Sequence, residues 1–380
     1  MINSKEKKYR CVHIMIINSN VHNESIIKVI SEIPEEKNEH IYIIKDEKSY
    51  EYLKKYENVI FEKNIINNVK ILIEYSKKCD YIFFHSLNVS IKYLLAIPKD
   101  VANRIIWVTW GHDIYRKEAI TLKEKVKKIF YYLLKFPLKK YKVNQFFAIG
   151  VGFKYDIIQI KKEFGARIKI LPLPYGYNKG KKEFIDTILN KSFEKKEKEY
   201  KIMIGHCAYS FLNHIEIMKK ILKYRNENIK ISLILSYGDQ TYANEVEKFA
   251  KENFSTNKLE IIKEKMSEKE YIEYLNSVDI CILDFKHQAA LGNLWRILYL
   301  KKKVFLSSNG ILKLATNFEG AKTYDVEMLD KISYEELIKP VDDKESCRKC
   351  AEFYINEENY LNMWKNSLNE LKNNEKVMLK

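Results

Sequence analysis

The sequence predicts an α/β fold with two domains, each built on a doubly wound parallel sheet. Short apolar runs typical of strands alternate with amphipathic, helix-like segments from the start of the chain. Several of these runs are continuously apolar, as in strands that are buried on both faces of a parallel sheet. The 380 residues are also too many for one typical domain and suit two.

The first half of the chain supplies six predicted strands. They are residues 10–18, 40–45, 58–62, 80–85, 104–110 and 145–150, with helices predicted at 65–78 and 88–97. After an interruption the alternation restarts, with strands at 200–204, 229–235, 259–263, 278–285 and 303–306 and helices at 213–224, 242–254, 268–276 and 291–300.

The interruption predicts where the domains meet. Pro174, Gly176, Gly180 and the charge-dense run KSFEKKEKE are typical of a connection between domains. We therefore expect a first domain over 1–175, a linker over 176–199, a second domain over 200–345 and a helical tail over 346–380. Ligands of such sheets bind outside the carboxyl ends of the strands, so a cleft between the two domains is expected to hold the site.

The net charge of +16 predicts an acidic partner, which could be nucleic acid, an anionic membrane or a phosphorylated ligand. Lys residues far outnumber Arg, and Lys is poorly suited to bidentate contacts with bases. We find no zinc finger, RNP-type motif or arginine-rich recognition helix, so we expect no nucleic-acid partner. A non-enzymatic nucleic-acid-binding protein is the alternative that the charge alone would support.

The chain contains no uninterrupted apolar run of about 18 residues, so no transmembrane helix is predicted. The N-terminal stretch MINSKEKKYRCVHIMIIN lacks a small-residue cleavage site and is interpreted as a first strand rather than a signal peptide. Six cysteines without a disulfide pattern indicate reduced thiols in a cytoplasmic protein. Cys347 and Cys350 form a CxxC with no second Cys or His pair nearby, so no zinc site is expected.

Two loops of the second half are candidates for binding an anion. In IMIGHCAYSFLNHIEIMKKI, 202–221, a strand ends at Gly205 and a helix begins near Asn213, so Ser210 and His214 would lie at a helix N-terminus. A capping box formed by Asn213 and Glu216 is the structural alternative.

The second loop is LDFKHQAALGNLWRILYL, 283–300, where small residues lead from a strand into a helix. Free N–H groups at the start of that helix favour a diphosphate, and Lys286 and His287 add positive charge. An ordinary strand-to-helix turn is the alternative.

The stretch WVTWGHDIYR, 107–116, ends a strand of the first half in a glycine turn that carries His112 and Asp113. The preceding predicted strand ends in FFHS, with His85. Side chains that follow neighbouring parallel strands meet at one edge of the sheet, which predicts a site there. As alternatives, Asp113 would cap the next helix and His112 would be an ordinary surface histidine.

WGHDIY, IGHCAYSFLNH and FKHQAALGNL, in this order, resemble the bacterial 4-acetamido-4,6-dideoxygalactose transferases over roughly 10–340. Those enzymes move that sugar from TDP to a polyprenyl-diphosphate-linked disaccharide in enterobacterial common antigen assembly. The family's motif residues fall on Trp110, Gly111, Asp113, Tyr115, His85, Gly205, Ser210, Asn213, His214, Gln288 and Gly292. The chain departs from the family at four positions. It has His287 where the family often has arginine and Asn293 where the family often has threonine. It has Ala289 and Ala290 where a glutamine and a glycine are expected.

The resemblance implies a GT-B glycosyltransferase with two Rossmann-like domains, the acceptor on the first and the sugar nucleotide on the second. It implies transfer of a deoxy-amino sugar from a TDP-type donor to a polyprenyl-diphosphate-linked saccharide, without a metal or other cofactor. The expected site residues are Asp113, His85 and His112 for catalysis, Trp110, Gly111 and Tyr115 for the acceptor, and Gly205, Ser210, Asn213, His214, Lys286, His287, Gln288, Gly292 and Asn293 for the donor. A sugar-nucleotide epimerase of the same fold is the second enzyme hypothesis.

The chemistry leaves two courses open. The departing nucleoside diphosphate must be stabilised by N–H groups, a helix dipole, Lys286 and His287. If the transfer inverts the anomeric centre, a base is needed and Asp113 is the candidate. If it retains the configuration, Asp113 and His112 would chiefly orient the acceptor hydroxyl.

The segment that follows WGHDIY is basic and amphipathic. Residues 116–142 carry ten Lys or Arg and two acidic residues around an apolar, aromatic middle, and Pro137 is expected to end the helix. Such a helix is typical of a membrane surface, so Lys125, Lys127, Lys128 and Phe130 are expected to contact the anionic cytoplasmic face of the bacterial inner membrane. A helix that packs on the sheet and exposes its lysines to water is the alternative.

Overall fold

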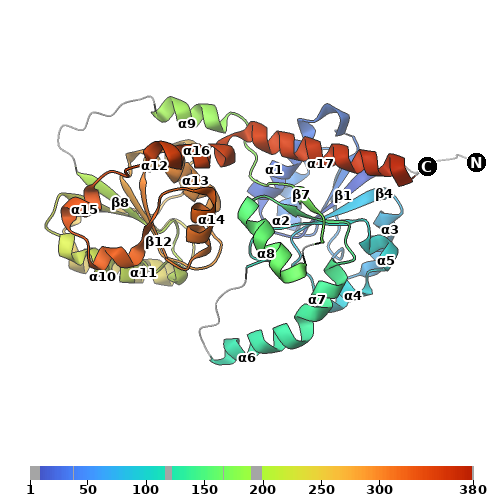
Figure 1. The fold of residues 1–380 in the computed structure, drawn as a ribbon, viewed down its shortest axis with the longest axis horizontal. Coiled ribbons are helices and arrows are strands. Elements are labelled where there is room, and N and C mark those ends of the chain that lie inside the picture. Colours follow the sequence, from blue (N-terminus) through green and yellow to red (C-terminus); the bar gives the residue numbers. More distant parts are fainter. Residues whose placement is uncertain (1–8, 37, 116–121, 166, 190–198, 379–380) are drawn as a thin grey trace, which may run out of the picture. The chain divides into compact units, whose positions relative to one another are not determined.

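The computed structural model describes residues 9–36, 38–115, 122–165, 167–189 and 199–378. The chain forms two compact units (Figure 1). The first comprises Met1–Lys179 together with Glu357–Lys380, and the second comprises Gly180–Asn356. Each unit has its own parallel sheet, as the sequence predicted, and the two are described separately.

The first unit is built on a seven-stranded parallel sheet of order β3-β2-β1-β4-β5-β6-β7. Its strands are β1 (Tyr9–Met15), β2 (His40–Ile44), β3 (Val59–Phe61), β4 (Cys79–His85), β5 (Ile105–Val108), β6 (Ala148–Val151) and β7 (Ile170–Pro172). Every residue of β2, β5 and β6 is buried, as the continuously apolar runs predicted. The sequence analysis did not predict the short β7.

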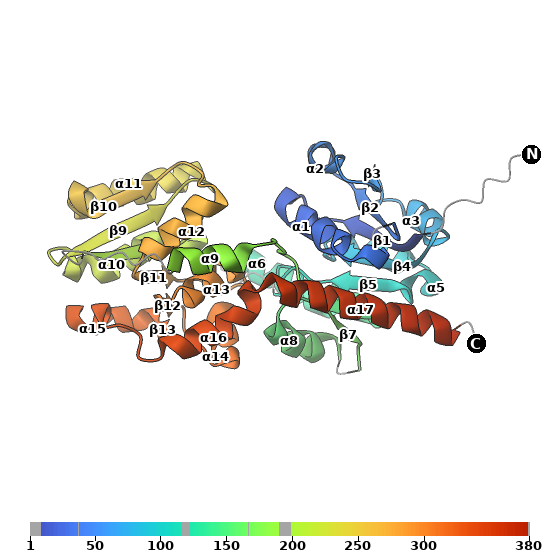
Figure 2. The ribbon, with the colours of Figure 1, turned by 90° about the horizontal axis from the view of Figure 1, so that it is seen from above.

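The helices of the first unit are α1 (Asn20–Ser31), α2 (Glu47–Leu53), α3 (Val69–Ser76), α4 (Ile91–Ala96), α5 (Lys99–Ala102), α6 (Leu122–Phe130), α7 (Phe136–Val143), α8 (Lys154–Phe164) and α17 (Glu357–Met378). The C-terminal helix α17 lies along the first unit (Figure 2). The indole N–H of Trp364 donates to the carbonyl oxygen of Pro174 at 2.7 Å, and Trp364 is fully buried. The segment predicted as a separate tail over 346–380 is therefore divided, with α17 completing the first core.

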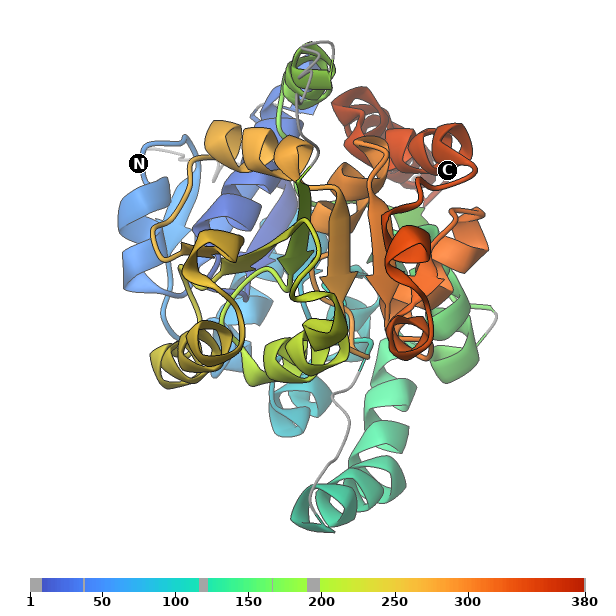
Figure 3. The same cartoon turned by 90° about the vertical axis from the view of Figure 1, so that its left-hand side faces the viewer.

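The second unit has a six-stranded parallel sheet of order β10-β9-β8-β11-β12-β13 with helices on both faces (Figure 3). The strands are β8 (Tyr200–Ile204), β9 (Ile229–Ile234), β10 (Leu259–Ile262), β11 (Ile280–Leu283), β12 (Lys303–Leu306) and β13 (Tyr324–Asp325). The helices are α9 (Lys181–Leu189), α10 (His214–Ile221), α11 (Gln240–Asn253), α12 (Glu268–Ser277), α13 (Leu291–Tyr299), α14 (Ile311–Glu319), α15 (Tyr334–Ile338) and α16 (Lys344–Ile355).

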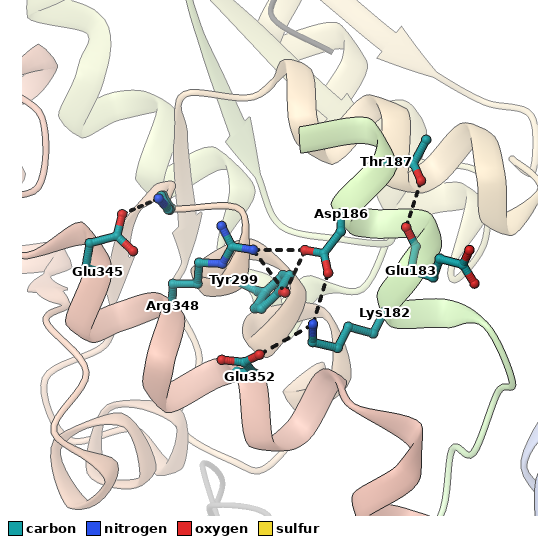
Figure 4. Close-up of polar contacts among 9 residues, drawn as sticks. Lys182, Glu183, Asp186, Thr187, Tyr299, Glu345, Arg348 and Glu352 are labelled. Atoms are coloured by element: carbon teal, nitrogen blue, oxygen red, sulfur yellow. Dashed lines mark hydrogen bonds and ion pairs between the residues drawn. The ribbon is translucent and has the colours of Figure 1, made fainter. Parts of the chain in front are cut away.

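The predicted linker over 176–199 contains α9, which is anchored to the second unit through Asp186 (Figure 4). The Asp186 carboxylate accepts hydrogen bonds from the hydroxyl of Tyr299 at 2.7 Å and from the guanidinium of Arg348 at 2.9 Å. Its second oxygen lies 3.0 Å from the ammonium of Lys182. Burial raises the pKa of Asp186, but the Tyr299 and Lys182 hydrogen bonds outweigh it and hold this pKa below its ordinary value. The boundary between the units consequently lies at 179/180, not after the whole linker.

The basic segment is helical beyond the proline that was expected to end it. Between α6 and α7, residues Tyr131–Lys135 form a π-helical turn, and the Phe136 N–H bonds to the carbonyl oxygen of Tyr131. Pro137 has no N–H and lies in the first turn of α7, where none is needed. The expectation that Pro137 ends the helix was wrong because the π turn shifts the hydrogen-bond register just before it.

Candidate functional site

A cavity of about 620 Å³ lies beside the carboxyl ends of β4 and β5 in the first unit. It is bounded by the loops that follow these strands and by the helical run from the π turn into α7. The lining residues are Leu87, Asn88, Val89, Ser90, Ile91, Lys92, Leu94, His112, Asp113, Tyr131, Lys135 and Lys139. The structure thus brings His112 and Asp113, two of the three predicted catalytic residues, to one cavity.

Asp113 holds the turn after β5 through three hydrogen bonds. Its Oδ1 accepts the backbone N–H of Trp110 at 2.9 Å. Its Oδ2 accepts the backbone N–H of Leu87 at 3.0 Å and the indole N–H of Trp107 at 2.8 Å. The alternative role as a helix cap is not seen in the described residues, since no described helix begins at this turn. The carboxylate instead ties the loops after β4 and β5 together.

His112 is the exposed member of the pair. Its Nε2 lies 3.3 Å from the hydroxyl oxygen of Ser86, which follows β4 in a left-handed backbone conformation with φ of 79°. Because His112 is exposed and lines the cavity, whereas three N–H groups already bond the Asp113 oxygens, the imidazole can reach a bound hydroxyl more readily than Asp113 can.

His85, the third predicted catalytic residue, is fully buried and does not line the cavity. It belongs to a chain of imidazoles in which His13 lies 2.9 Å from His85 and 2.7 Å from His40, between ring nitrogens. His40 is in turn 3.0 Å from a carboxylate oxygen of Glu36. Burial lowers the pKa of His85 to about 3, and burial likewise lowers the pKa values of His13 and His40.

The residues predicted to bind the acceptor lie elsewhere on the turn. Trp110 is stacked on Tyr175, with ring centroids 4.8 Å apart, and meets the edge of His22 at 5.0 Å. Tyr115 is buried and donates its hydroxyl hydrogen to Asp156 at 2.9 Å. Burial and the Asp156 charge raise its pKa. Gly111 has φ of 73°, a conformation that favours glycine. None of the three is among the cavity-lining residues.

In the second unit, the loop after β8 contains a close approach between Gly205 and His214. A Cβ built on Gly205 would lie 2.3 Å from His214 Nε2, and Gly205 has φ of 66°. His214 is fully buried, and neither of its ring nitrogens has a hydrogen-bond partner among the described residues. Both predicted donor residues are therefore held together, with glycine providing the space for the imidazole.

Asn213 occupies the N-cap position of α10, but its side chain makes no capping hydrogen bond. Its amide N–H groups instead donate to the backbone carbonyl of Asp284 at 3.1 Å and to its carboxylate at 3.3 Å. The capping-box alternative is therefore wrong. The left-handed φ of 53° is one that asparagine tolerates, and it directs the amide across to the end of β11.

The second predicted donor loop ends where expected, because α13 begins at Leu291. Ala290, the N-cap residue of α13, has a left-handed φ of 54°, and its methyl side chain makes no capping hydrogen bond to the first N–H groups of the helix. A Cβ on Gly292 would meet nothing within 4 Å. Lys286 and the Ser210 side chain are exposed, whereas His287, Gln288 and Asn293 are half-buried.

Two polar side chains at this edge, His206 and Asp284, were not among the residues predicted from the sequence. Burial and the neighbouring His287 lower the pKa of His206 to about 4, and its Nδ1 has no partner among the described residues. Burial raises the pKa of Asp284 despite hydrogen bonds from Asn213 and Ser307. Each follows the end of an apolar strand run, which is the signal that could have identified it.

The predicted membrane-contacting residues lie on α6, whose described side chains are all outside the buried core. Phe130 is 59% exposed. Of 19 large exposed apolar side chains in the described chain, nine lie in this segment: Leu122, Val126, Ile129, Phe130, Tyr132, Leu133, Leu134, Leu138 and Tyr141. The alternative of a helix packed on the sheet therefore does not describe α6. None of the described helices is long and apolar enough to cross a membrane.

The arrangement of two parallel-sheet units resembles several solved glycosyltransferases. A glycosyltransferase from Rickettsia africae ESF-5 matches with a TM-score of 0.64 at 15% identity, covering 96% of this chain and 98% of that chain. Anabaena Alr3699/HepE in complex with UDP matches with a TM-score of 0.65 at 10% identity, covering 95% and 100%. A UDP-forming α,α-trehalose-phosphate synthase from Burkholderia xenovorans matches at 0.58 and 10%, covering 96% and 99%. The fold is that of a GT-B glycosyltransferase, as predicted.

The family follows from the sequence match. The model described as 4-alpha-L-fucosyltransferase, glycosyl transferase group 56, matches residues 9–373. The chain belongs to this family and is a glycosyltransferase, which confirms the resemblance on which the expected activity rests.

Proposed function

We propose that the protein transfers a deoxy-amino sugar from a TDP-type nucleotide to a polyprenyl-diphosphate-linked saccharide in bacterial surface-polysaccharide synthesis. Family membership supports the reaction class. A structural neighbour crystallised with UDP supports a nucleoside-diphosphate sugar as donor. The nature of the acceptor is supported chiefly by the surface of α6.

The observation that carries this proposal is the exposed apolar face of α6 and the π turn. From Leu122 to Val143 the chain has eight Lys and one acidic residue, Glu124. Exposed apolar side chains interleaved with lysines are typical of helices that lie in the interface of an anionic bilayer. Each Lys near such a surface contributes about 1 kcal/mol. We place the protein peripherally on the cytoplasmic face of the inner membrane, where a lipid-linked acceptor would be found.

We place the donor at the edge of the second sheet where the carboxyl ends of its strands lie. There the N-terminus of α13 offers N–H groups and the positive end of a helix dipole to a diphosphate. Lys286 and His287 precede this helix and add positive charge as the nucleoside diphosphate departs. We propose that these groups act without a metal ion. Among the described residues no group of three His, Cys, Asp or Glu side chains is arranged to hold one.

We place the acceptor in the first unit, in the cavity that His112 and Asp113 line. His112 contacts the acceptor hydroxyl, as a base if the transfer inverts or as an orienting group if it retains. Asp113 acts as a positioning residue, because three N–H groups already occupy its two oxygens.

A transfer assay tests the proposal. Purified protein would be incubated with a panel of nucleoside-diphosphate sugars and a polyprenyl-diphosphate-linked saccharide in vesicles containing phosphatidylglycerol, with and without EDTA. We expect turnover with a TDP-linked deoxy-amino sugar that EDTA leaves unchanged. Turnover restricted to epimerisation of the donor would contradict the proposed reaction, and loss of activity in EDTA would contradict the metal-free mechanism alone.

A further inference from the structure

The cavity beside β4 and β5 is basic on the side that faces the helical run. Lys135 and Lys139 line it from the π turn and α7, and Lys92 lines it from α4. We propose that this cavity binds the diphosphate group of the lipid-linked acceptor. The inference rests on the proposed function and adds to it a site for the acceptor's anionic group, separate from the donor diphosphate in the second unit.

The charge balance of the cavity favours an anion with several negative charges. Asp113 is the one acidic side chain among the described lining residues, and its oxygens already accept three N–H groups. Lys139 is held at the inner end, with its ammonium 3.4 Å from the carbonyl oxygen of Asp113 and 4.9 Å from the Trp107 ring centre. Lys92 and Lys135 are exposed at the rim. Three lysines thus line a space that has one carboxylate, whose two oxygens already accept hydrogen bonds.

The size and the polar lining fit a diphosphate with its first sugar. A volume of about 620 Å³ falls within the range of roughly 300–1,000 Å³ that is common for small-molecule sites. Asn88 and Ser90 add polar side chains to the lining, and the Ser90 hydroxyl, whose oxygen accepts the Tyr93 N–H at 3.1 Å, still has a hydrogen to donate. His112 lies in the same cavity, so a sugar attached to the diphosphate would be within reach of the group proposed to contact the acceptor hydroxyl.

The helical run connects this cavity to the apolar surface. Tyr131, Lys135 and Lys139 are spaced four residues apart and therefore share the face that lines the cavity. The same helical run exposes Leu134, next to Lys135, at 60% and Leu133 at 69%. A polyprenyl chain leaving the diphosphate would thus have exposed apolar side chains of this run within reach. Figure 1 shows α6 standing away from the sheet of the first unit while α7 returns to it.

A phospholipid headgroup has the same phosphate chemistry, so the test separates the two sources. The probes are farnesyl diphosphate, inorganic pyrophosphate, farnesol and phosphatidylglycerol vesicles. Binding would be measured by calorimetry on the full chain with saturating TDP, which occupies the proposed donor site. The cavity variant is Lys92→Glu with Lys135→Glu. The matched control is Lys70→Glu with Lys99→Glu, two exposed lysines of the first unit outside the cavity with the same total charge change.

We expect the cavity variant to bind farnesyl diphosphate at least about tenfold more weakly than wild type, as expected for loss of two charge-assisted contacts. The control should change this Kd by less than about twofold, and farnesol should not compete. Because Lys135 also belongs to the basic membrane-facing segment, vesicle binding of the cavity variant should fall no further than that of Lys127→Glu, a single charge reversal on α6. Equal loss in both variants, or unchanged binding in the cavity variant, would overturn the site. A loss of vesicle binding clearly larger than that of Lys127→Glu would assign the cavity to a phospholipid headgroup instead.

A failure of the proposed function itself would give a different experimental result. In that case TDP would neither bind nor stabilise the protein, whichever lysines were replaced. Thermal unfolding of both variants checks that the exposed substitutions leave the fold intact.

Discussion

At the scale of single residues, we assign Asp113 to positioning the cavity loops and His112 to contact with the acceptor hydroxyl. The Asp113 carboxylate faces three N–H donors, so an amide at this position must turn its NH₂ toward at least one of them. Asp113→Asn should therefore lower the free energy of unfolding by about 1–3 kcal/mol, the cost of an unsatisfied buried group. Urea titration followed by tryptophan fluorescence measures it.

His112→Ala provides the contrasting case. Because His112 is exposed, we expect an unchanged unfolding midpoint and a fall in sugar transfer of at least about 100-fold if it acts as general base. If His112→Ala transfers sugar at close to the wild-type rate and Asp113→Asn is inactive but stable, then Asp113, not His112, contacts the acceptor hydroxyl.

Two glycines of the second unit offer a matched pair of substitutions. Gly205→Ala places a methyl group against the His214 ring in a backbone conformation that only glycine adopts easily. Gly292→Val directs its side chain into open space at the start of α13. We expect Gly205→Ala to lower the thermal midpoint, and Gly292→Val to leave it nearly unchanged while weakening TDP binding at least about tenfold, because the branched side chain obstructs a bound diphosphate. TDP binding at wild-type affinity in Gly292→Val would place the phosphate site elsewhere.

At the scale of the element, α6 and the π turn carry seven of the large exposed apolar side chains of the described first unit, from Leu122 to Leu134. Reversing the charge at Lys125, Lys127 and Lys128 should reduce binding to vesicles containing phosphatidylglycerol, because each lysine contributes about 1 kcal/mol near an anionic surface. Donor binding, which is placed in the second unit, should be unchanged. Co-sedimentation with vesicles measures the first effect and thermal shift with TDP the second.

The apolar contribution is tested separately by Leu133→Ser with Leu134→Ser. Both side chains are exposed, so the fold should tolerate the change, and vesicle binding should weaken at high salt, where the lysines are screened. Unchanged vesicle binding after both sets of substitutions would mean that α6 and the π turn are an ordinary solvated surface that does not contact a membrane.

At the scale of the whole molecule, buried histidines make stability depend on pH. Burial lowers the pKa of His85 to about 3 and those of His206 and His214 to about 4, and it also lowers those of His13 and His40. An unfolded histidine takes up a proton below about pH 6.5, whereas these remain neutral in the folded state. The unfolded state then binds more protons, so stability falls as the pH decreases from about 6.5 toward the folded pKa values.

At pH 5 each of His85, His206 and His214 costs about 2 kcal/mol relative to neutral pH, and His13 and His40 act in the same direction. Trp107, Trp110 and Trp364 all lie in the first unit, so tryptophan fluorescence during urea unfolding reports mainly on the unit that contains His13, His40 and His85. We expect the unfolding midpoint to drop steeply between pH 6.5 and 5, and less so in a His13→Gln variant. A midpoint independent of pH over this interval would mean that these histidines are protonated in the folded protein.

The sequence by itself determined the fold class, most strand positions and the family. The limits of β8 and β12 coincide with the predicted 200–204 and 303–306, and α13 begins at the predicted residue. These features depend on local apolar patterns and on turn residues, which the sequence shows directly. The same patterns placed His112 and Asp113 at a strand end, and hence at one edge of the sheet.

Only the tertiary structure decided how those residues are used. The hydrogen bond from Leu87 to Asp113, the one from Asn213 to Asp284 and the chain from His85 to Glu36 join residues far apart in the sequence. The same holds for α17, which returns to the first unit, and for α9, which joins the second. No local pattern records such contacts, because they are set by which surfaces meet when the strands assemble into sheets. Local patterns in the sequence therefore predict that the site lies at the carboxyl edge of the sheet. The packing of distant side chains decides which polar side chains at that edge are accessible to a substrate.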